Sequence, residues 1–156
     1  MIEVTCTRFV RGSPAHIFEI LADPTNLARM LPRVRRIDVL EQFDDHARIA
    51  THMAFGPFGT VRNEGEARWR DGSEISFISR TPIFVETRWQ IVPANAGATV
   101  NVILRLDLAP LIGPLAGFIP PRQVVEMVAP ELEAALAALA TQVEAASADN
   151  PHPASL

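Results

Sequence analysis

The stretch LADPTNLARMLPRVRRIDVLE, residues 21–41, contains the strongest signals for the architecture of this chain. Asp23 followed by Pro24 marks a helix start, because the Asp side chain can cap free backbone N–H groups and proline suits the first helical position. Pro32 disfavours helical geometry at Leu31 and should end this helix. An alternating apolar run follows, so a short helix is predicted to lead directly into a strand.

The same start signal stands just upstream of this stretch. Ser13 and Pro14 repeat the pair of capping residue and proline, so two small helices are predicted between about residues 14 and 31. Before them, residues 2–10 (IEVTCTRFV) alternate well enough for a first strand.

Six further strand patterns follow the helices, and turn residues separate them. The expected strands cover residues 35–43, 46–55, 58–70, 74–80, 83–93 and 98–108. Every connection between them is short, so neighbouring strands should pair antiparallel as a meander.

The last predicted element is a long helix over residues 123 to about 146. Its apolar residues recur at three- and four-residue spacing and line one face: Val125, Val128, Leu132, Leu136, Leu139 and Val143. Pro130 lies inside this pattern and should kink the helix or mark a restart. Residues 147–156 are predicted to be a disordered tail, and residues 1–146 a single domain.

These elements predict an α+β fold. A curved antiparallel sheet of seven strands would wrap around the long C-terminal helix, with two short helices after the first strand. The long helix is the only large element available to cover one face of the sheet, so the sheet should grip it.

Period-two alternation predicts an inner face that is apolar, with a few uncharged polar groups. Those polar residues are Thr51, Asn63, Ser79 and Thr87. Gly65 and Ala67 are small beside Trp69 and Trp89, which leaves two alternatives: close packing of the helix, or a cavity between sheet and helix. Asn63 favours a cavity, because a buried amide without partners is costly.

Composition excludes several classes of chemistry. All 14 basic residues are arginine and there is no tyrosine, which excludes lysine Schiff-base chemistry and a tyrosine acid. The single Cys6 excludes an internal disulfide and a cysteine-based zinc site. The net charge of −4 argues against nucleic-acid binding.

The sequence contains no recognised motif for catalysis, metal binding or cofactor binding. The four histidines fall into no ligand spacing, and no carboxylate pair is predicted on the inner face, so we predict no metal, cofactor or catalytic residue. GPFG at 56–59 lies between two strands and is expected to be a hairpin connection. With no membrane-span pattern and no signal-peptide pattern, a cytoplasmic protein is expected.

Two surface features leave alternatives open. The apolar segment APLIGPLAGFIPP, residues 109–121, is either an extension of the long helix packed on the sheet, a mobile gate, or a patch for transient membrane or protein contact. Arg33, Arg35 and Arg36 form either a solvated corner or a charged rim that meets an anionic head group.

The chain resembles the polyketide cyclase/dehydrase and lipid-transport superfamily, which includes START-type, birch-pollen-allergen-like and coenzyme Q-binding proteins. The resemblance is carried by SPAHIFEILADPTNLARMLPRVRRIDVLE (13–41), RWQIVPANAGATVNVILRLDL (88–108), and the apolar join and helix that follow, and it spans about residues 2–146. It implies a helix-grip fold with a hydrophobic cavity that takes lipids, quinones or polyketides. The coenzyme Q-binding branch would favour a quinone or isoprenoid.

We therefore predict a binder or carrier of a small hydrophobic ligand held between the sheet and the C-terminal helix. The predicted ligand-binding residues are Thr51, Met53, Phe55, Asn63, Trp69, Phe77, Thr87, Trp89, Phe118 and Met127.

Two alternatives to a carrier stay open. The first is a polyketide cyclase or dehydratase that acts by shape and a positioned water or arginine. By resemblance, such cyclases place an arginine, tyrosine or tryptophan on the inner wall, and a bulge could turn Arg68 or Arg88 inward. The second is an interaction module that docks through residues 109–121 without a ligand. The identity of the ligand, the enzymatic status and the oligomeric state are left open by the sequence.

Overall fold

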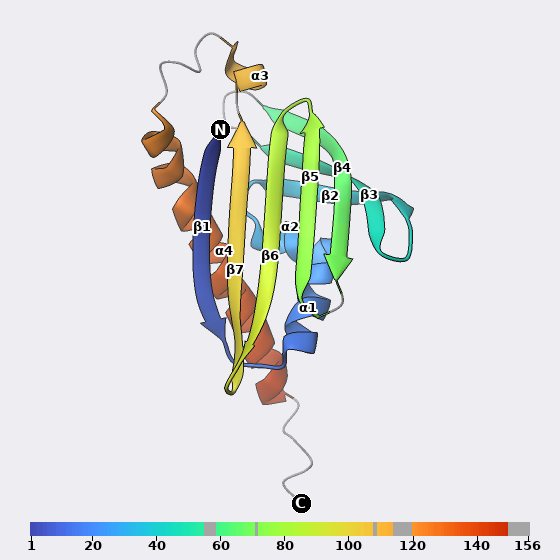
Figure 1. The fold of residues 1–156 in the computed structure, drawn as a ribbon, viewed down its shortest axis with the longest axis vertical. Coiled ribbons are helices and arrows are strands. Elements are labelled where there is room, and N and C mark those ends of the chain that lie inside the picture. The colour runs from blue at the N-terminus through green and yellow to red at the C-terminus, as the bar shows by residue number, and fades with distance from the viewer. Residues whose placement is uncertain (55–58, 71, 108, 114–119, 150–156) are drawn as a thin grey trace, which may run out of the picture.

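A computed structural model describes residues 1–54, 59–70, 72–107, 109–113 and 120–149 (Figure 1). The elements in chain order are β1 (Ile2–Val10), α1 (Pro14–Ala22), α2 (Pro24–Met30), β2 (Val34–Gln42), β3 (His46–Ala54), β4 (Thr60–Arg70), β5 (Glu74–Thr81), β6 (Phe84–Ala94), β7 (Gly97–Asp107), α3 (Ala109–Ile112) and α4 (Pro121–Asp149). Each predicted strand is present, and within the described ranges its ends lie at most two residues from the predicted ones.

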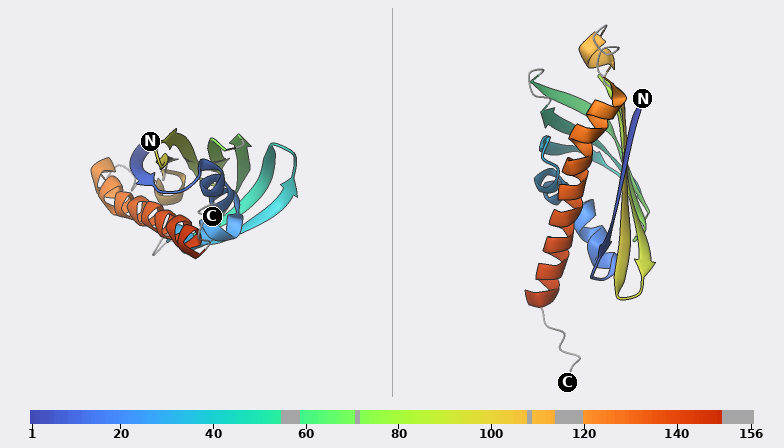
Figure 2. Two further views of the ribbon diagram at one scale, coloured as in Figure 1. Left: turned by 90° about the horizontal axis from the view of Figure 1, so that it is seen from below. Right: turned by 90° about the vertical axis from the view of Figure 1, so that its left-hand side faces the viewer.

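The strands form one seven-stranded sheet in the order β1-β7-β6-β5-β4-β3-β2, and all neighbours are antiparallel. The meander from β2 to β7 is confirmed, and β1 extends it by pairing with β7. The sheet is curved, and the helices α1, α2 and α4 lie on the same side of it (Figure 2). The predicted α+β helix-grip architecture is therefore confirmed.

The two short helices begin and end where the sequence predicts. The Ser13 side chain accepts a hydrogen bond from the backbone N–H of His16 at 3.1 Å, and Asp23 Oδ1 accepts one from the backbone N–H of Thr25 at 2.9 Å. Leu31, which precedes Pro32, has an extended backbone and ends α2. These local signals confine both helices to the connection between β1 and β2.

Helix α4 is longer than predicted. It runs without a break from Pro121 to Asp149, which excludes a restart at Pro130 and leaves a kink as the other predicted effect of this proline. Residues 147–149 are helical, so the predicted disordered tail is wrong for these three; residues 150–156 lie outside the described part of the chain.

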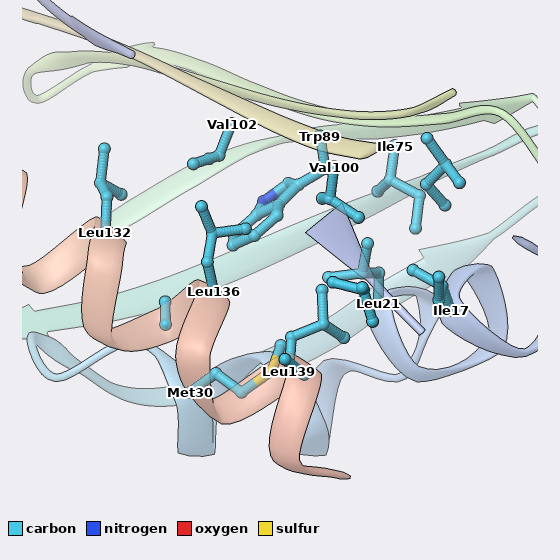
Figure 3. Close-up of a cluster of buried hydrophobic side chains, with 14 of the residues drawn as sticks. Ile17, Leu21, Met30, Ile75, Trp89, Val100, Val102, Leu132, Leu136 and Leu139 are labelled. Atoms are coloured by element: carbon cyan, nitrogen blue, oxygen red, sulfur yellow. The ribbon is translucent and has the colours of Figure 1, made fainter. Parts of the chain in front are cut away.

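The apolar core lies between α4, the sheet and the two short helices. Helix α4 packs along β1 and against α1 and α2. Leu132, Leu136 and Leu139 of α4 point toward Trp89 and Val102 of the sheet (Figure 3). Because α4 lies over the β1 side of the sheet, it leaves the inner face of β3 to β5 for other elements to cover.

The apolar segment that joins β7 to α4 is not a helical extension of α4. It contains the separate short helix α3, and Gly113 follows with a left-handed φ of 57°. Residues 114–119, and with them Phe118, lie outside the described residues, so docking through 109–121 stays a prediction. Among the described helices, none is both long and apolar enough to cross a membrane.

Candidate functional site

Two adjoining cavities lie between the inner face of the sheet and the helices. The first, of about 120 Å³, is enclosed by α2, by β2 to β7 and by Leu132 of α4. The second, of about 190 Å³, lies beside α1 and α2 over β2 to β5. Five apolar residues line both cavities and lie between them: Leu27, Ile37, Ile49, Ala67 and Ile75.

The space arises from residue size and from the position of α4. Ala67 is a small inward residue of β4, and it lines the first cavity together with the large side chain of Trp89 on β6. Helix α4 reaches the first cavity only with Leu132, since it packs mainly over β1. Helix α2 therefore supplies the opposite wall, through Leu27 and Leu31.

The polar side chains on the inner face differ in whether their hydrogen-bonding capacity is satisfied. Ser79 donates to the backbone oxygen of Glu64 at 2.9 Å, so it is a structural group. Thr51 is 5% exposed and Asn63 is fully buried, and neither Thr51 Oγ1 nor Asn63 Oδ1 has a partner among the described residues. The Asn63 Nδ2 amide donates only to the thioether of Met53, at 3.9 Å.

The sequence matches the family described as polyketide cyclase/dehydrase and lipid transport over residues 1–144. The chain belongs to this family. Its fold is therefore one that binds small hydrophobic ligands, and the superfamily resemblance inferred from the sequence is confirmed. No curated protein matches the sequence.

Solved structures share the fold of this family member at low identity. A protein from Thermus thermophilus superposes with a TM-score of 0.78 at 23% identity, covering 93% of this chain and 99% of that one. The Zhui aromatase/cyclase from a Streptomyces species has a TM-score of 0.69 at 17% identity, covering 97% and 96%. A STAR-related lipid transfer protein from Xanthomonas axonopodis has a TM-score of 0.66 at 12% identity, covering 90% and 84%.

Most of the predicted ligand-binding residues surround the two cavities. The first cavity is lined by Thr51, Met53, Phe77, Thr87 and Trp89, and the second by Trp69. Asn63 lies next to Thr51 in the β3–β4 pairing and against Met53, without lining either cavity itself.

Three predicted residues are not brought to the cavities by the described structure. Placing Met127 in the cavity wall is wrong: its side chain is 51% exposed, because α4 turns the neighbouring Val124 and Val128 toward the core instead. Phe55 and Phe118 lie outside the described residues.

The prediction missed the wall formed by α2 and β2. Leu27 and Leu31 of α2, together with Val34 and Ile37 at the start of β2, line the first cavity. A signal was present, since Leu27 and Leu31 are four residues apart and therefore share one helix face. No pattern in the sequence indicates that α2 lies directly over the sheet.

No charged side chain lines either cavity in the described part of the chain. A register shift does occur in the β4–β5 pairing between Glu64 and Glu66, yet Arg68 stays outside and pairs with Glu66 at 2.6 Å. Arg88 also points outward, with Nε 3.8 Å from Glu74 Oε1. Neither arginine is thus turned into the cavity lining that the described residues form.

Among the described residues, two titratable groups have shifted pKa values, and neither lines the two cavities. Burial raises the pKa of the Cys6 thiol, and the negative charge of Glu133 adds to this rise. The hydrogen bond from His46 lowers the pKa of Asp45, which lies in the exposed turn between β2 and β3. Neither group therefore supplies acid or base chemistry to the cavities.

An ion pair lies at the rim of the first cavity. Arg33 Nε is 2.9 Å from Glu131 Oε2 of α4, and Arg33 Nη1 donates to the backbone oxygen of Ala54 at 3.4 Å. The residues next to this pair, Val34 and Leu132, line the cavity. The side chains are only 26% and 25% exposed, so the solvated-corner alternative is wrong for Arg33, while Arg35 and Arg36 are exposed.

We expect Glu131→Ala to lower the free energy of unfolding by about 1 kcal/mol, because it leaves a half-buried guanidinium without its carboxylate. A bound hydrophobic probe should also dissociate several-fold faster, since the pair ties α4 to the α2–β2 corner. Stopped-flow release of Nile red measures this rate. Glu126→Ala is the matched control, because Glu126 lies on the same helix in an exposed pair with Arg122. Equal release rates in the two variants would contradict a role for the Arg33–Glu131 pair.

Proposed function

We propose that the protein binds and carries a small hydrophobic molecule in the two adjoining cavities between the sheet, α2 and α4. The observation that carries this proposal is an apolar cavity beside two buried polar atoms without partners, Thr51 Oγ1 and Asn63 Oδ1. A mostly apolar pocket with a few placed polar groups is the usual form of a small-molecule site. Membership of a family that includes lipid transport supports the same function.

The volume of the cavities sets the size of the ligand. Each cavity alone, at about 120 and 190 Å³, is smaller than the roughly 300–1,000 Å³ of most ligand sites. Side chains such as Leu27, Ile37 and Ile49 separate them, and rotation of these side chains would join the two spaces. The joined space reaches the lower end of that range, which suits a ligand of one to three fused rings or a short isoprenoid.

Burial of the ligand supplies its affinity. A ligand that buries roughly 300 Å² of apolar surface gains about 7 kcal/mol before the costs of association are subtracted. Trp89 and Phe77 provide broad apolar contact area, and Thr51 lies where a polar end can be oriented.

A polyketide cyclase or dehydratase is the second candidate function. The likeness in fold to the Zhui aromatase/cyclase favours it. The described cavity lining argues against it, because it holds no charged or acid–base side chain, and catalysis would have to come from shape and a positioned water. A carrier needs only the burial and the polar contacts that are present, and we therefore place it first.

Native mass spectrometry of the purified protein tests the carrier function. We expect a complex heavier than the chain, which releases a hydrophobic molecule on extraction with organic solvent. A protein that is empty and also fails to bind Nile red would overturn the proposal. Conversion of a linear poly-β-ketone into an aromatic product would instead favour the cyclase.

A further inference from the structure

The two buried polar atoms without partners lie next to each other in the sheet. Thr51 of β3 and Asn63 of β4 are directly paired in the register, and both side chains point to the inner face. Thr51 lines the first cavity, and Met53, which covers the Asn63 amide, lines it as well. Methionine is unbranched and adaptable, so a rotation of Met53 opens the amide to the cavity.

The chemistry of these atoms restricts what can satisfy them. Asn63 Oδ1 is a carbonyl oxygen and can only accept a hydrogen bond, whereas the Thr51 hydroxyl both donates and accepts. A ligand group that satisfies Asn63 Oδ1 must therefore carry an O–H or N–H. A ketone, a quinone or an ether has no donor, and it would leave this buried oxygen unpaired at a cost in affinity.

The electrostatics of the cavities restrict the charge of the ligand. No charged side chain lines either cavity in the described residues, so an ionised group would be buried without a counter-ion. Arg33 at the rim already holds Glu131 at 2.9 Å. A carboxylate ligand would therefore have to displace an existing ion pair.

Resting on the proposed function, we infer that the ligand is a neutral hydrophobic alcohol or phenol. Its hydroxyl donates to Asn63 Oδ1 and lies against Thr51 Oγ1, while its hydrocarbon part fills the cavities lined by Trp89 and Phe77. This class excludes quinones and fatty acids, which the family resemblance alone would have admitted.

Three naphthalene probes test this inference by isothermal titration calorimetry. 2-Naphthol carries a donor, 2-methoxynaphthalene is of similar shape and only accepts, and 2-naphthoate is an anion at neutral pH. We expect the wild-type protein to bind 2-naphthol about tenfold more tightly than the ether, and to bind 2-naphthoate most weakly.

Asn63→Leu should bring the ratio of the naphthol and ether affinities close to one, because it removes the acceptor. Thr51→Val should weaken both probes several-fold and keep the ratio, since the threonine hydroxyl can donate to the oxygen of either probe. Because the ratio is compared between proteins, the difference in size between the two probes cancels. Thr51→Val keeps the shape of the side chain, so its loss of affinity for 2-naphthol tests the contact with the ligand hydroxyl even if Asn63→Leu fails to fold. Thr5→Val, the same change at an exposed position on β1, should keep the tenfold ratio.

The outcomes separate this inference from the proposed function. Equal binding of 2-naphthol and the ether by the wild-type protein, an unchanged ratio in a folded Asn63→Leu protein, unchanged binding of 2-naphthol by Thr51→Val, or tightest binding of 2-naphthoate would overturn the alcohol inference and leave the carrier function standing. If no probe binds and no hydrophobic molecule co-purifies, the carrier function fails and the inference fails with it.

Discussion

Ala67→Phe is expected to abolish ligand binding while the protein still folds. Ala67 points inward from β4 and lines both cavities, so a phenyl ring at this position occupies the space between Trp89 and α2 that the ligand needs. Loss of roughly 100 Å² of ligand burial corresponds to about 2.5 kcal/mol, or close to a 100-fold loss in affinity. Titration with Nile red or 2-naphthol measures the change.

The same variant should unfold at a temperature equal to or above that of the wild-type protein. A ring that fills an existing cavity gains van der Waals contacts, whereas a ring forced into a close-packed core would cost about 1–3 kcal/mol. Ala134→Phe makes the same change at an exposed position on α4 and should leave binding intact. Strong destabilisation of Ala67→Phe would mean that this part of the fold is already filled, which would contradict the cavity.

The elements of the fold could be predicted because their signals are local. Ser13 and Asp23 cap the two helices with their own side chains, and Pro32 acts on the residue just before it. Alternation assigned the inner face of the strands correctly, since a strand residue can point to only one of two sides.

The helix face was harder to predict than the strand faces. Residues 124–128 of α4 read VVEMV, with apolar residues at four of five consecutive positions. Such a run does not mark where the buried stripe ends, so Met127 was assigned to the cavity although it is exposed. The contacts of α4 with β1, α1 and α2 fix the rotation of the helix about its axis.

The walls of the cavity depend on contacts between distant segments. Arg33 and Glu131 are 98 residues apart in the chain, and nothing near either residue indicates that they meet. The position of α2 over the sheet likewise follows from the curvature of the sheet, which no local pattern encodes. Small Gly65 and Ala67 left both close packing and a cavity open, and Asn63 favoured the cavity because a buried amide without partners is costly.

Leu139→Ala and Leu132→Ala are expected to differ strongly in stability, although both change the same residue type on the inward face of α4. Leu139 is fully buried in the close-packed core away from both cavities, whereas Leu132 is 3% exposed and borders the first cavity. Removing Leu139 opens a new void and should cost about 4 kcal/mol of the free energy of unfolding. Removing Leu132 should cost about 2 kcal/mol, because its side chain already lacks neighbours on the cavity side.

Urea unfolding measures both values, and the two substitutions share the same change in helix propensity, so the difference reports packing alone. The effect on the size of probe that the protein accepts should be larger for Leu132→Ala than for Leu139→Ala. Leu132→Ala enlarges the first cavity and should accept larger probes than the wild-type protein, while Leu139→Ala should leave the preferred probe size unchanged. Equal losses of stability, together with unchanged probe size in Leu132→Ala, would show that Leu132 packs as tightly as Leu139 and that α4 does not border the ligand site.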